Sequence, residues 1–236
     1  LANPYDVDIS LIIPSIDFKG FSNLYDSLQK RCSCPNRVEM LIKIDNLDEI
    51  NKYYDLCEQS TFKYKIIVYP SFNGRFSLHH FFNDLGFISS GKILWMLNDD
   101  AEIVGGTDWY KPLMSTRDLL RDNIYYVSIP YDNGKGTKQI VPLPAISREW
   151  HELLKSVTEF PNYDRWLHEI AKAMSRRIIL NEEEIVVTMP PGSRVLSKQD
   201  RKSIFHPRVD SVIEHALQSV GKPDFDVNKL RRTKSG

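Results

Sequence analysis

Apolar and polar positions alternate in a regular order over the first 110 residues. Short runs rich in Ile, Leu, Val and Tyr predict strands at 8–14, 38–44, 64–69 and 93–98. Between these runs, apolar residues recur at helical spacing, which predicts helices around 21–28 and at 47–57 and 76–88. Pro14 is expected to end the first strand and Ser22 to cap the first helix. Alternating strands and helices indicate an α/β fold with a mostly parallel sheet covered on both faces.

The pattern changes in the second half of the chain. Strands are predicted at 124–129, 138–143, 178–180 and 185–189, and helices at 147–157, 163–176 and 210–220. A Pro-Pro-Gly break at 190–192 precedes a basic segment. We therefore expect one domain with two halves, 1–110 and 111–222, and a tail over 223–236 whose composition is typical of disorder.

Composition narrows the class of protein. The chain has 236 residues, 42% of them hydrophobic, and its 31 basic residues balance 31 acidic ones. This balance gives no overall field that favours nucleic acid or an anionic membrane, and no apolar run approaches the ~20 residues of a membrane-spanning helix. The N-terminal residues lack the basic start and apolar core of a secretory signal, and three irregularly spaced cysteines favour reduced thiols. We therefore expect a cytoplasmic protein.

Two adjacent carboxylates, Asp99 and Asp100, follow the predicted strand at 93–98, in which five of the six residues are apolar. Such a run predicts a buried strand, and open α/β sheets bind ligands at the carboxyl ends of their strands. Adjacent carboxylates repel each other unless a cation lies between them, and hard oxygen ligands suit Mg²⁺ or Mn²⁺, ions usually shared with a phosphate. The pair therefore predicts a divalent metal presented to a phosphorylated substrate. The alternative is a pair of solvated turn or helix-capping residues.

Asp17 and Asp45 follow two other predicted strands. Because parallel strands end at one edge of a sheet, these acids are expected to share a crevice with the Asp99–Asp100 pair. That crevice has room for a base, a ribose and a metal-bound diphosphate, and Asp45 is placed to accept a hydrogen bond from a base N–H or a ribose hydroxyl. Each acid alone is also compatible with a simple turn.

The order of these residues resembles the GT-A nucleotide-diphospho-sugar glycosyltransferases, in particular enzymes similar to glycosyltransferase family 2. The resemblance covers roughly 8–180 and rests on Pro14, an acid after the second strand, Asn73-Gly74, Asn83, Ser90-Gly91, Asn98-Asp99-Asp100 and Asp108-Trp109. The D-x-D signature of that family maps onto Asn98-x-Asp100, with Asn in place of the first acid. The resemblance implies a GT-A-like (Rossmann-like) fold with an acceptor-side extension, a metal at Asp100, and donor contacts from Pro14, Asp17, Asp45, Asn73, Asn83, Asn98 and Asp99.

The same resemblance implies a catalytic base at the start of an acceptor-side helix, where Asp164 stands. The alternatives are that Asp164 only interacts with the helix dipole, or that Glu149 or Glu169 is the base. His206 corresponds to C-terminal histidines that bind metal in some GT-A enzymes. The basic segment 193–208 is interpreted as a lid in which Arg194 and Arg201 neutralise the donor diphosphate. Trp109 and Trp166 are expected to face the acceptor.

The sequence therefore predicts metal-assisted, inverting transfer of a sugar from a nucleotide-diphospho-sugar, with a UDP-sugar favoured, to a glycan or other hydroxyl acceptor. One alternative is a catalytically inactive nucleotide-sugar-binding module, which the Asn at position 98 supports. Another is a sugar nucleotidyltransferase. Enzymes of that class carry a glycine-rich, basic loop after the first strand, whereas 15–20 holds a single glycine.

Overall fold

A seven-stranded sheet forms the centre of the part of the chain that the computed structural model describes, which is residues 6–45, 47–70, 77–132, 138–139, 142–159, 163–189 and 208–220. Its strands, in spatial order, are β10 (Arg177–Ile179), β6 (Tyr126–Ser128), β9 (Ala145–Ser147), β4 (Ile93–Met96), β1 (Ile9–Ser15), β2 (Val38–Ile44) and β3 (Lys63–Val68). All neighbouring strands are parallel except β9, which is antiparallel to both β4 and β6. The prediction of a mostly parallel sheet is confirmed.

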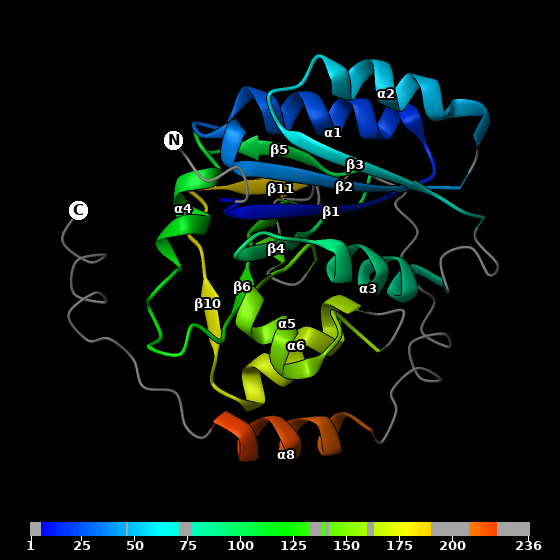
Figure 1. The fold of residues 1–236 in the computed structure, drawn as a ribbon. Coiled ribbons are helices and arrows are strands. Elements are labelled where there is room, and N and C mark those ends of the chain that lie inside the picture. The colour runs from blue at the N-terminus through cyan, green and yellow to red at the C-terminus, as the bar shows by residue number, and fades with distance from the viewer. Residues whose placement is uncertain are drawn as a thin grey trace.

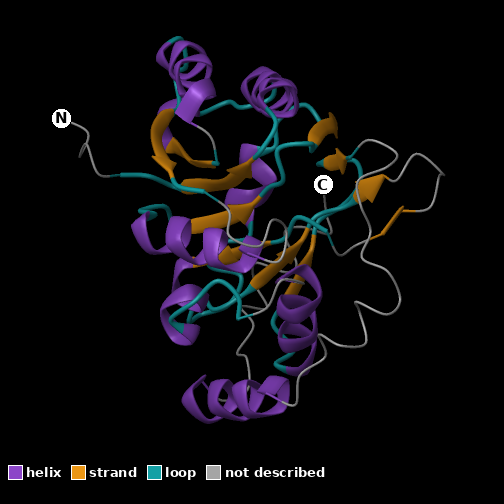
Figure 2. Ribbon diagram, turned by 90° about the vertical axis from the view of Figure 1, so that its right-hand side faces the viewer, coloured by secondary structure: helices purple, strands orange, loops and turns teal. Residues whose placement is uncertain are grey.

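Helices cover both faces of this sheet (Figure 1). On one face lie α1 (Phe18–Lys30) and α2 (Ile50–Glu58), and on the other lie α3 (Leu78–Ile88), α5 (Arg148–Leu154), α6 (Tyr163–Ala173) and α8 (Arg208–Val220). The alternation of β1 explains this layering, because Leu11 and Ile13 pack with α1 while Ile12 packs with α3. The view in Figure 2 shows the same strands between two sets of helices.

Shorter elements complete the described chain: η1 (Pro35–Arg37), η2 (Leu47–Glu49) and α4 (Tyr110–Ser115). A second sheet has the order β5 (Glu102–Gly105), β11 (Val186–Thr188), β7 (Tyr131–Asp132) and β8 (Lys138–Gln139). The β5–β11 pair joins the segment after β4 to residues 186–188 of the second half, and Gly106 permits the close approach of the two backbones. It has φ +77, and a Cβ there would lie 2.0 Å from the Glu184 carbonyl oxygen.

Several expected boundaries were wrong. Of the strand expected at 138–143, Lys138–Gln139 form β8 in the second sheet, 140–141 lie outside the described residues and 142–143 are not in a strand. The helix expected at 147–157 ends already at Leu154. The cap of α1 is Asp17 rather than Ser22, since the Asp17 carboxylate accepts hydrogen bonds from the amides of Lys19 and Gly20. β5, β9 and α4 were not predicted, because their short apolar stretches show no clear period.

β1 also continues through Pro14 instead of ending there. The Ile12 carbonyl accepts a hydrogen bond from Leu97, so the nitrogen of Pro14, two residues further on, points to the same side of the strand. The register with β4 ends at the Ile12–Met96 pair, so the missing N–H of Pro14 breaks no bond of that ladder.

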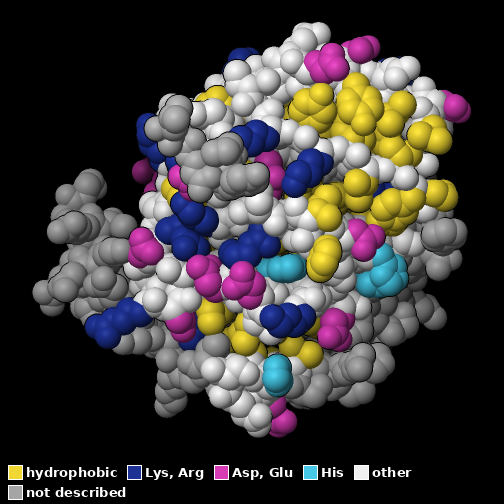
Figure 3. Space-filling model, in the orientation of Figure 1, with side chains coloured by type: hydrophobic (Ala, Val, Ile, Leu, Met, Phe, Trp, Pro, Cys, Tyr) yellow, Lys and Arg dark blue, Asp and Glu magenta, His cyan; other side chains and the backbone are white. Residues whose placement is uncertain are grey.

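The described surface has no dominant charge on the face that Figure 3 shows. Lysine and arginine side chains are interspersed with acidic ones, and apolar side chains gather over α2 and β3. This mixture agrees with the equal numbers of basic and acidic residues in the sequence.

Candidate functional site

The carboxyl ends of β1, β2 and β4 meet at one edge of the central sheet. The last register pair of β1 and β2 is Ser15 with Ile44, and Ile12 pairs with Met96 of β4. The residues that follow these three strands, including Asp17, Asp45 and the 98–100 turn, therefore lie at the same edge. This is the edge at which open α/β sheets bind ligands.

Asp99 holds the loop between β1 and α1. Its Oδ2 accepts hydrogen bonds from the Ser15 hydroxyl at 3.1 Å, the Ile16 amide at 2.7 Å and the Asp17 amide at 2.9 Å. Burial, together with the nearby charge of Asp100, raises the pKa of Asp99, and the three hydrogen bonds lower it. The raising effects are the larger, so the pKa of Asp99 lies above its ordinary value. Asp99 was expected to contact the donor, and the observed contacts show that it also builds the loop beside the crevice.

The first turn of α1 packs directly on the 98–100 turn. A Cβ on Gly20 would lie 2.9 Å from the Asp99 carbonyl oxygen, so any larger residue would push these segments apart. Asp17 caps this helix through hydrogen bonds of 3.2 Å from the Lys19 amide and 3.0 Å from the Gly20 amide. A donor contact by Asp17 stays a prediction beside this capping role.

Asp100 offers an oxygen that fits a metal ion. A hydrogen bond of 3.1 Å from the Ala101 amide to the Asn98 carbonyl closes the turn, and Asp100 Oδ1 is buried without a hydrogen-bond partner in the described structure. Buried polar atoms nearly always have partners, and a carboxylate oxygen suits Mg²⁺ or Mn²⁺. The described residues form no cluster of three or more acidic, histidine or cysteine side chains placed to hold a metal. A metal at Asp100 therefore needs further ligands, which a diphosphate and water supply in such sites.

Asn98 connects this turn to the second half of the chain. Its amide nitrogen lies 3.5 Å from Met189 Sδ, and its Oδ1 accepts a 3.4 Å contact from the Tyr163 hydroxyl. Burial, followed by the charges of Asp164 and Asp100, raises the pKa of Tyr163 well above its ordinary value, so this hydroxyl remains a donor. The sequence did not single out Tyr163, because an aromatic residue at a helix start is usually a core residue.

Asp164 follows Tyr163 in the first turn of α6 and is half-buried. Its Oδ1 accepts a hydrogen bond of 2.8 Å from the Arg165 amide. Because Tyr163 reaches Asn98, the start of α6 lies against the turn that carries Asp100. The structure therefore brings the candidate base and the candidate metal residue to the same edge of the sheet.

Asn83 has a structural role in the described chain. Its amide oxygen accepts hydrogen bonds from the amides of Val157 at 2.8 Å and Thr158 at 3.0 Å, and its amide nitrogen donates to the Thr158 carbonyl at 2.7 Å. These contacts tie α3 to the segment after α5, and they account for Asn83 without a donor contact. The other expected contacts at Asn73, Arg194, Arg201 and His206, with nearly all of the 193–208 lid, lie outside the described residues.

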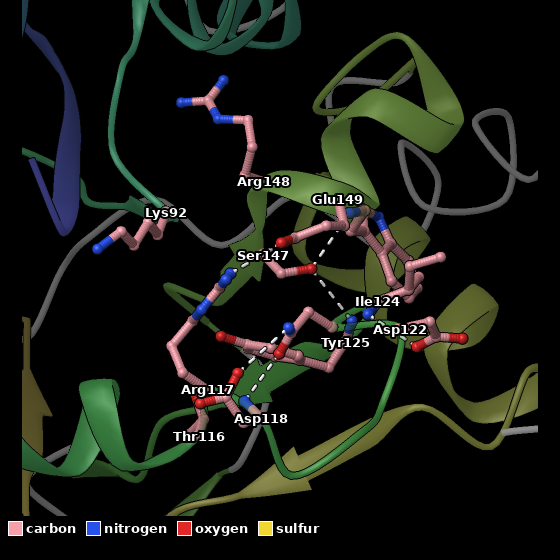
Figure 4. Close-up of polar contacts among 12 residues, drawn as sticks. Lys92, Thr116, Arg117, Asp118, Asp122, Ile124, Tyr125, Ser147, Arg148 and Glu149 are labelled. Carbon is pink, nitrogen blue, oxygen red and sulfur yellow. Dashed lines mark hydrogen bonds and ion pairs between the residues drawn. The ribbon is translucent and has the colours of Figure 1, made fainter. Parts of the chain in front are cut away.

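Glu149 lies at the opposite edge of the sheet and does not suit the role of base. Ser147 pairs with Ile93, the first residue of β4, so α5 begins at the amino end of that strand. There Glu149 accepts hydrogen bonds of 3.1 and 3.0 Å from Arg117, beside Tyr125 and Ser147 (Figure 4). The pair fixes α5 against the segment after α4, far along the strand from Asp100.

The tryptophans expected to face the acceptor are buried. Trp109 is 1% exposed, and its indole N–H donates to the Leu28 carbonyl at 2.7 Å. Trp166, which belongs to α6, packs in the core between that helix and the sheet. The prediction that they face the acceptor was wrong, because both indoles are buried in the core.

No protein-family model matches this sequence, and no curated protein matches it. Several solved structures are similar to this chain. TarS from S. aureus in complex with UDP is 15% identical with a TM-score of 0.62, and the match covers 96% of this chain and 68% of that one. The mannosyltransferase PcManGT from Pyrobaculum calidifontis in complex with GDP-Man and Mn²⁺ is 13% identical with a TM-score of 0.61, covering 99% and 83%.

A third similar structure is GalNAc-T7 with UDP, GalNAc and Mn²⁺, which is 14% identical with a TM-score of 0.56 and covers 78% of this chain and 44% of that one. These likenesses show that the chain has the GT-A fold, as the sequence predicted. None of the described helices combines the length and the apolar character needed to cross a bilayer.

Proposed function

We propose that this protein transfers a sugar from a nucleotide-diphospho-sugar to an acceptor hydroxyl, with Mn²⁺ or Mg²⁺. The observation that carries the proposal is that Asp100 Oδ1, at the carboxyl edge of the sheet in a GT-A fold, is buried and has no hydrogen-bond partner among the described residues. Support comes from similar structures solved in complex with UDP, UDP-GlcNAc or GDP-Man, two of them with Mn²⁺.

The donor side of the proposed site consists of Asp45 and the loop that Asp99 holds. Asp45 accepts a hydrogen bond from the base or the ribose, and the 15–17 loop lies beside it through the β1–β2 register. We favour a UDP-sugar, since several similar structures were solved in complex with UDP or UDP-GlcNAc. Arg194, Arg201 and His206 remain candidates for contacts to the diphosphate and metal.

In the proposed reaction, the acceptor oxygen forms a bond to the anomeric carbon while the bond from that carbon to the diphosphate oxygen breaks. Asp164 takes the acceptor proton, and Asp100 holds the metal. A bound Mn²⁺ or Mg²⁺ offsets the charge that develops on the leaving diphosphate. Direct displacement of this kind inverts the configuration at the anomeric carbon. Tyr163 and Asn98 keep the start of α6 against the Asp100 turn, which fixes the base relative to the donor.

A nucleotide-sugar screen tests the proposal. UDP-, GDP-, CMP- and dTDP-sugars are each added with Mn²⁺ or with EDTA, and the melting temperature is measured. We expect one class to raise it only with Mn²⁺, because a ligand that binds the folded state stabilises it. The matching donor should then release nucleoside diphosphate in the presence of acceptor or water. Release of pyrophosphate from a nucleoside triphosphate and a sugar 1-phosphate would instead indicate a nucleotidyltransferase, and no shift with any nucleotide-sugar would reject the proposal.

A catalytically inactive nucleotide-sugar-binding module is the second candidate, favoured by Asn98. This residue replaces the first acid of the signature, and its amide faces Tyr163 and Met189 rather than a second carboxylate. Metal-dependent binding of a nucleotide-sugar without turnover, over a panel of sugar acceptors and water, would identify such a module. Turnover would exclude it.

A further inference from the structure

Lys43 is a fully buried lysine at the end of β2. It is 0% exposed, and its ammonium lies 3.8 Å from the centre of the Phe81 ring and 4.7 Å from that of Tyr69. The same ammonium forms an ion pair with the Asp45 carboxylate. The neighbouring Ile42 and Ile44 pack in the core on the α1 side, so alternation directs Lys43 to the α3 side of the sheet.

The position of this ammonium is set from several directions. A lysine loses its hydration when it is buried, and an opposite charge together with aromatic faces restores part of that stabilisation. Tyr69 is itself fixed, because its hydroxyl donates to Asp84 at 2.5 Å and its ring meets Phe81 edge-on at 5.6 Å. The cation therefore fixes the carboxylate oxygen that it holds, Asp45 Oδ1.

Asp45 lies where the proposed donor base would bind. It follows Ile44, whose register partner is Ser15, so it neighbours Ile16 at the carboxyl edge of the sheet. The Ile16 side chain is 77% exposed, and its amide is held by Asp99. The Asp45 side chain keeps 28% of its surface exposed, whereas that of Lys43 keeps 1%. One side of the Asp45 carboxylate thus faces a buried cation, and the remaining exposure is available to a ligand.

We infer that Lys43 is a positioning residue for donor recognition: it holds Asp45 so that the carboxylate accepts the ring N–H of the nucleobase. This inference rests on the proposed function and specifies its substrate class. Uracil, thymine and guanine carry a ring N–H, whereas the corresponding ring nitrogen of cytosine and adenine is unprotonated and would face the carboxylate oxygen. An acceptor-only carboxylate therefore selects the first group.

A lysine that only fills the core would behave differently. Its loss would lower the stability of the whole sheet, and any loss of affinity would be similar for all nucleotides. A positioning residue acts through Asp45, so its loss should remove the same base preference that loss of Asp45 removes. The ratio of affinities for two bases separates the roles, because a general loss of stability leaves this ratio unchanged.

The experiment compares wild type, Lys43→Met, Asp45→Ala and the double variant, with Lys52→Met as a control. Lys52 lies on the surface of α2 in an ion pair with Glu49. Dissociation constants for UDP, GDP and CDP are measured by calorimetry with Mn²⁺, alongside melting temperatures. We expect wild type to bind UDP or GDP about tenfold or more tightly than CDP, since one hydrogen bond to a charged group is worth at least that factor.

Lys43→Met should reduce this ratio to the value of Asp45→Ala, the double variant should reduce it no further, and Lys52→Met should keep it. A wild-type ratio in Lys43→Met would overturn the inference while leaving the proposed function intact, as would equal binding of the three nucleotides by wild type. Wild type that binds none of them would reject both. If Lys43→Met does not fold, Phe81→Leu removes one aromatic face and should lower the ratio; an unchanged ratio there would also overturn the inference.

Discussion

The carboxylate of Asp99 accepts a hydrogen bond of 2.7 Å from the backbone amide of Ile16, a residue 83 positions earlier in the sequence. The same oxygen also accepts from Ser15 and Asp17. The two adjacent acids after β4 therefore differ in their surroundings. Asp99 is an anchor for the β1–α1 loop, whereas Asp100 has a buried oxygen without a partner in the described structure.

Asp99→Ala should destabilise the protein by about 3 kcal/mol and weaken nucleotide binding. The change removes the acceptor of three hydrogen bonds to one loop, and bonds to charged groups contribute about 1.5–3 kcal/mol each without being additive. Asp99→Asn keeps an acceptor oxygen and should lose less. Urea unfolding and a nucleotide dissociation constant measure the two effects. Wild-type stability in Asp99→Ala would show that the loop does not need this anchor.

Asp100→Ala should abolish metal-dependent activity while the protein stays folded. Losing a charge that holds the metal should raise the barrier by at least about 2–4 kcal/mol, comparable to removing a key electrostatic group. Turnover is measured over a range of Mn²⁺ concentrations, with circular dichroism to check the fold. Asp55→Ala, on the exposed side of α2, is the matched control and should leave both properties unchanged. Unchanged Mn²⁺-dependent turnover in Asp100→Ala would place the metal elsewhere.

The sequence located the carboxyl edge of the sheet, where we propose that the ligand binds, because apolar runs end in acids there. The strand predicted at 38–44 is β2 with the same bounds, and its register with β1 brings Asp45 beside Ile16. The pairing of Asp99 with that loop was not predictable, since it depends on segments 83 positions apart. The antiparallel β9 was missed for a similar reason, because three residues carry no period and only the neighbouring strands define it.

Lys43 shows a second limit of sequence reasoning. A lysine in an apolar strand is a visible irregularity, but its meaning depends on Tyr69 and Phe81, which come from β3's end and from α3. Trp109 shows the reverse case. Its aromatic character suggested a sugar contact, and only the structure shows that the Leu28 carbonyl satisfies its N–H in the core. In both places the role depends on surroundings that the sequence does not show.

Acid should destabilise the protein through Asp8. Burial opposes ionisation of this carboxylate, but hydrogen bonds from Arg37, Tyr110 and Lys92 outweigh it and hold the pKa of Asp8 well below its usual range. The lowered pKa means that this stabilisation is present above the unfolded pKa of about 4 and is lost as pH falls through the folded value. Asp8→Asn should therefore cost about 1–3 kcal/mol at pH 7 and progressively less below pH ~4.

Unfolding by urea between pH 2 and 7 measures the Asp8 effect. Asp6→Asn is the control, since that carboxylate pairs with the same Arg37 and Lys92 but its side chain is 41% exposed. It should change stability much less than Asp8→Asn does, because exposed pairs are screened by solvent. A difference between wild type and Asp8→Asn that stayed constant over this pH range would contradict the assignment.

Asp164→Asn should lower turnover by about 10²–10⁴-fold and change nucleotide affinity little. A general base contributes a factor of that order, and the proposed contacts to the base and the ribose of the donor lie in the first half of the chain. The contact between Tyr163 and Asn98 holds this residue beside the Asp100 turn, which is the geometry that a base requires. If Asp164 only interacts with the helix dipole, the substitution should instead reduce stability by less than about 1 kcal/mol and leave turnover near normal.

Two other acids of the second half, Glu149 and Glu169, are compared with Asp164. Glu149→Gln alters the ion pair with Arg117 at the opposite edge of the sheet, so it should affect stability and leave the chemical step alone. Glu169→Gln changes an acid five residues further along α6. Turnover, nucleotide affinity and melting temperature are measured on all three variants. Full activity in Asp164→Asn with a large loss in Glu169→Gln would move the base to Glu169, because the start of α6 would then not face the acceptor.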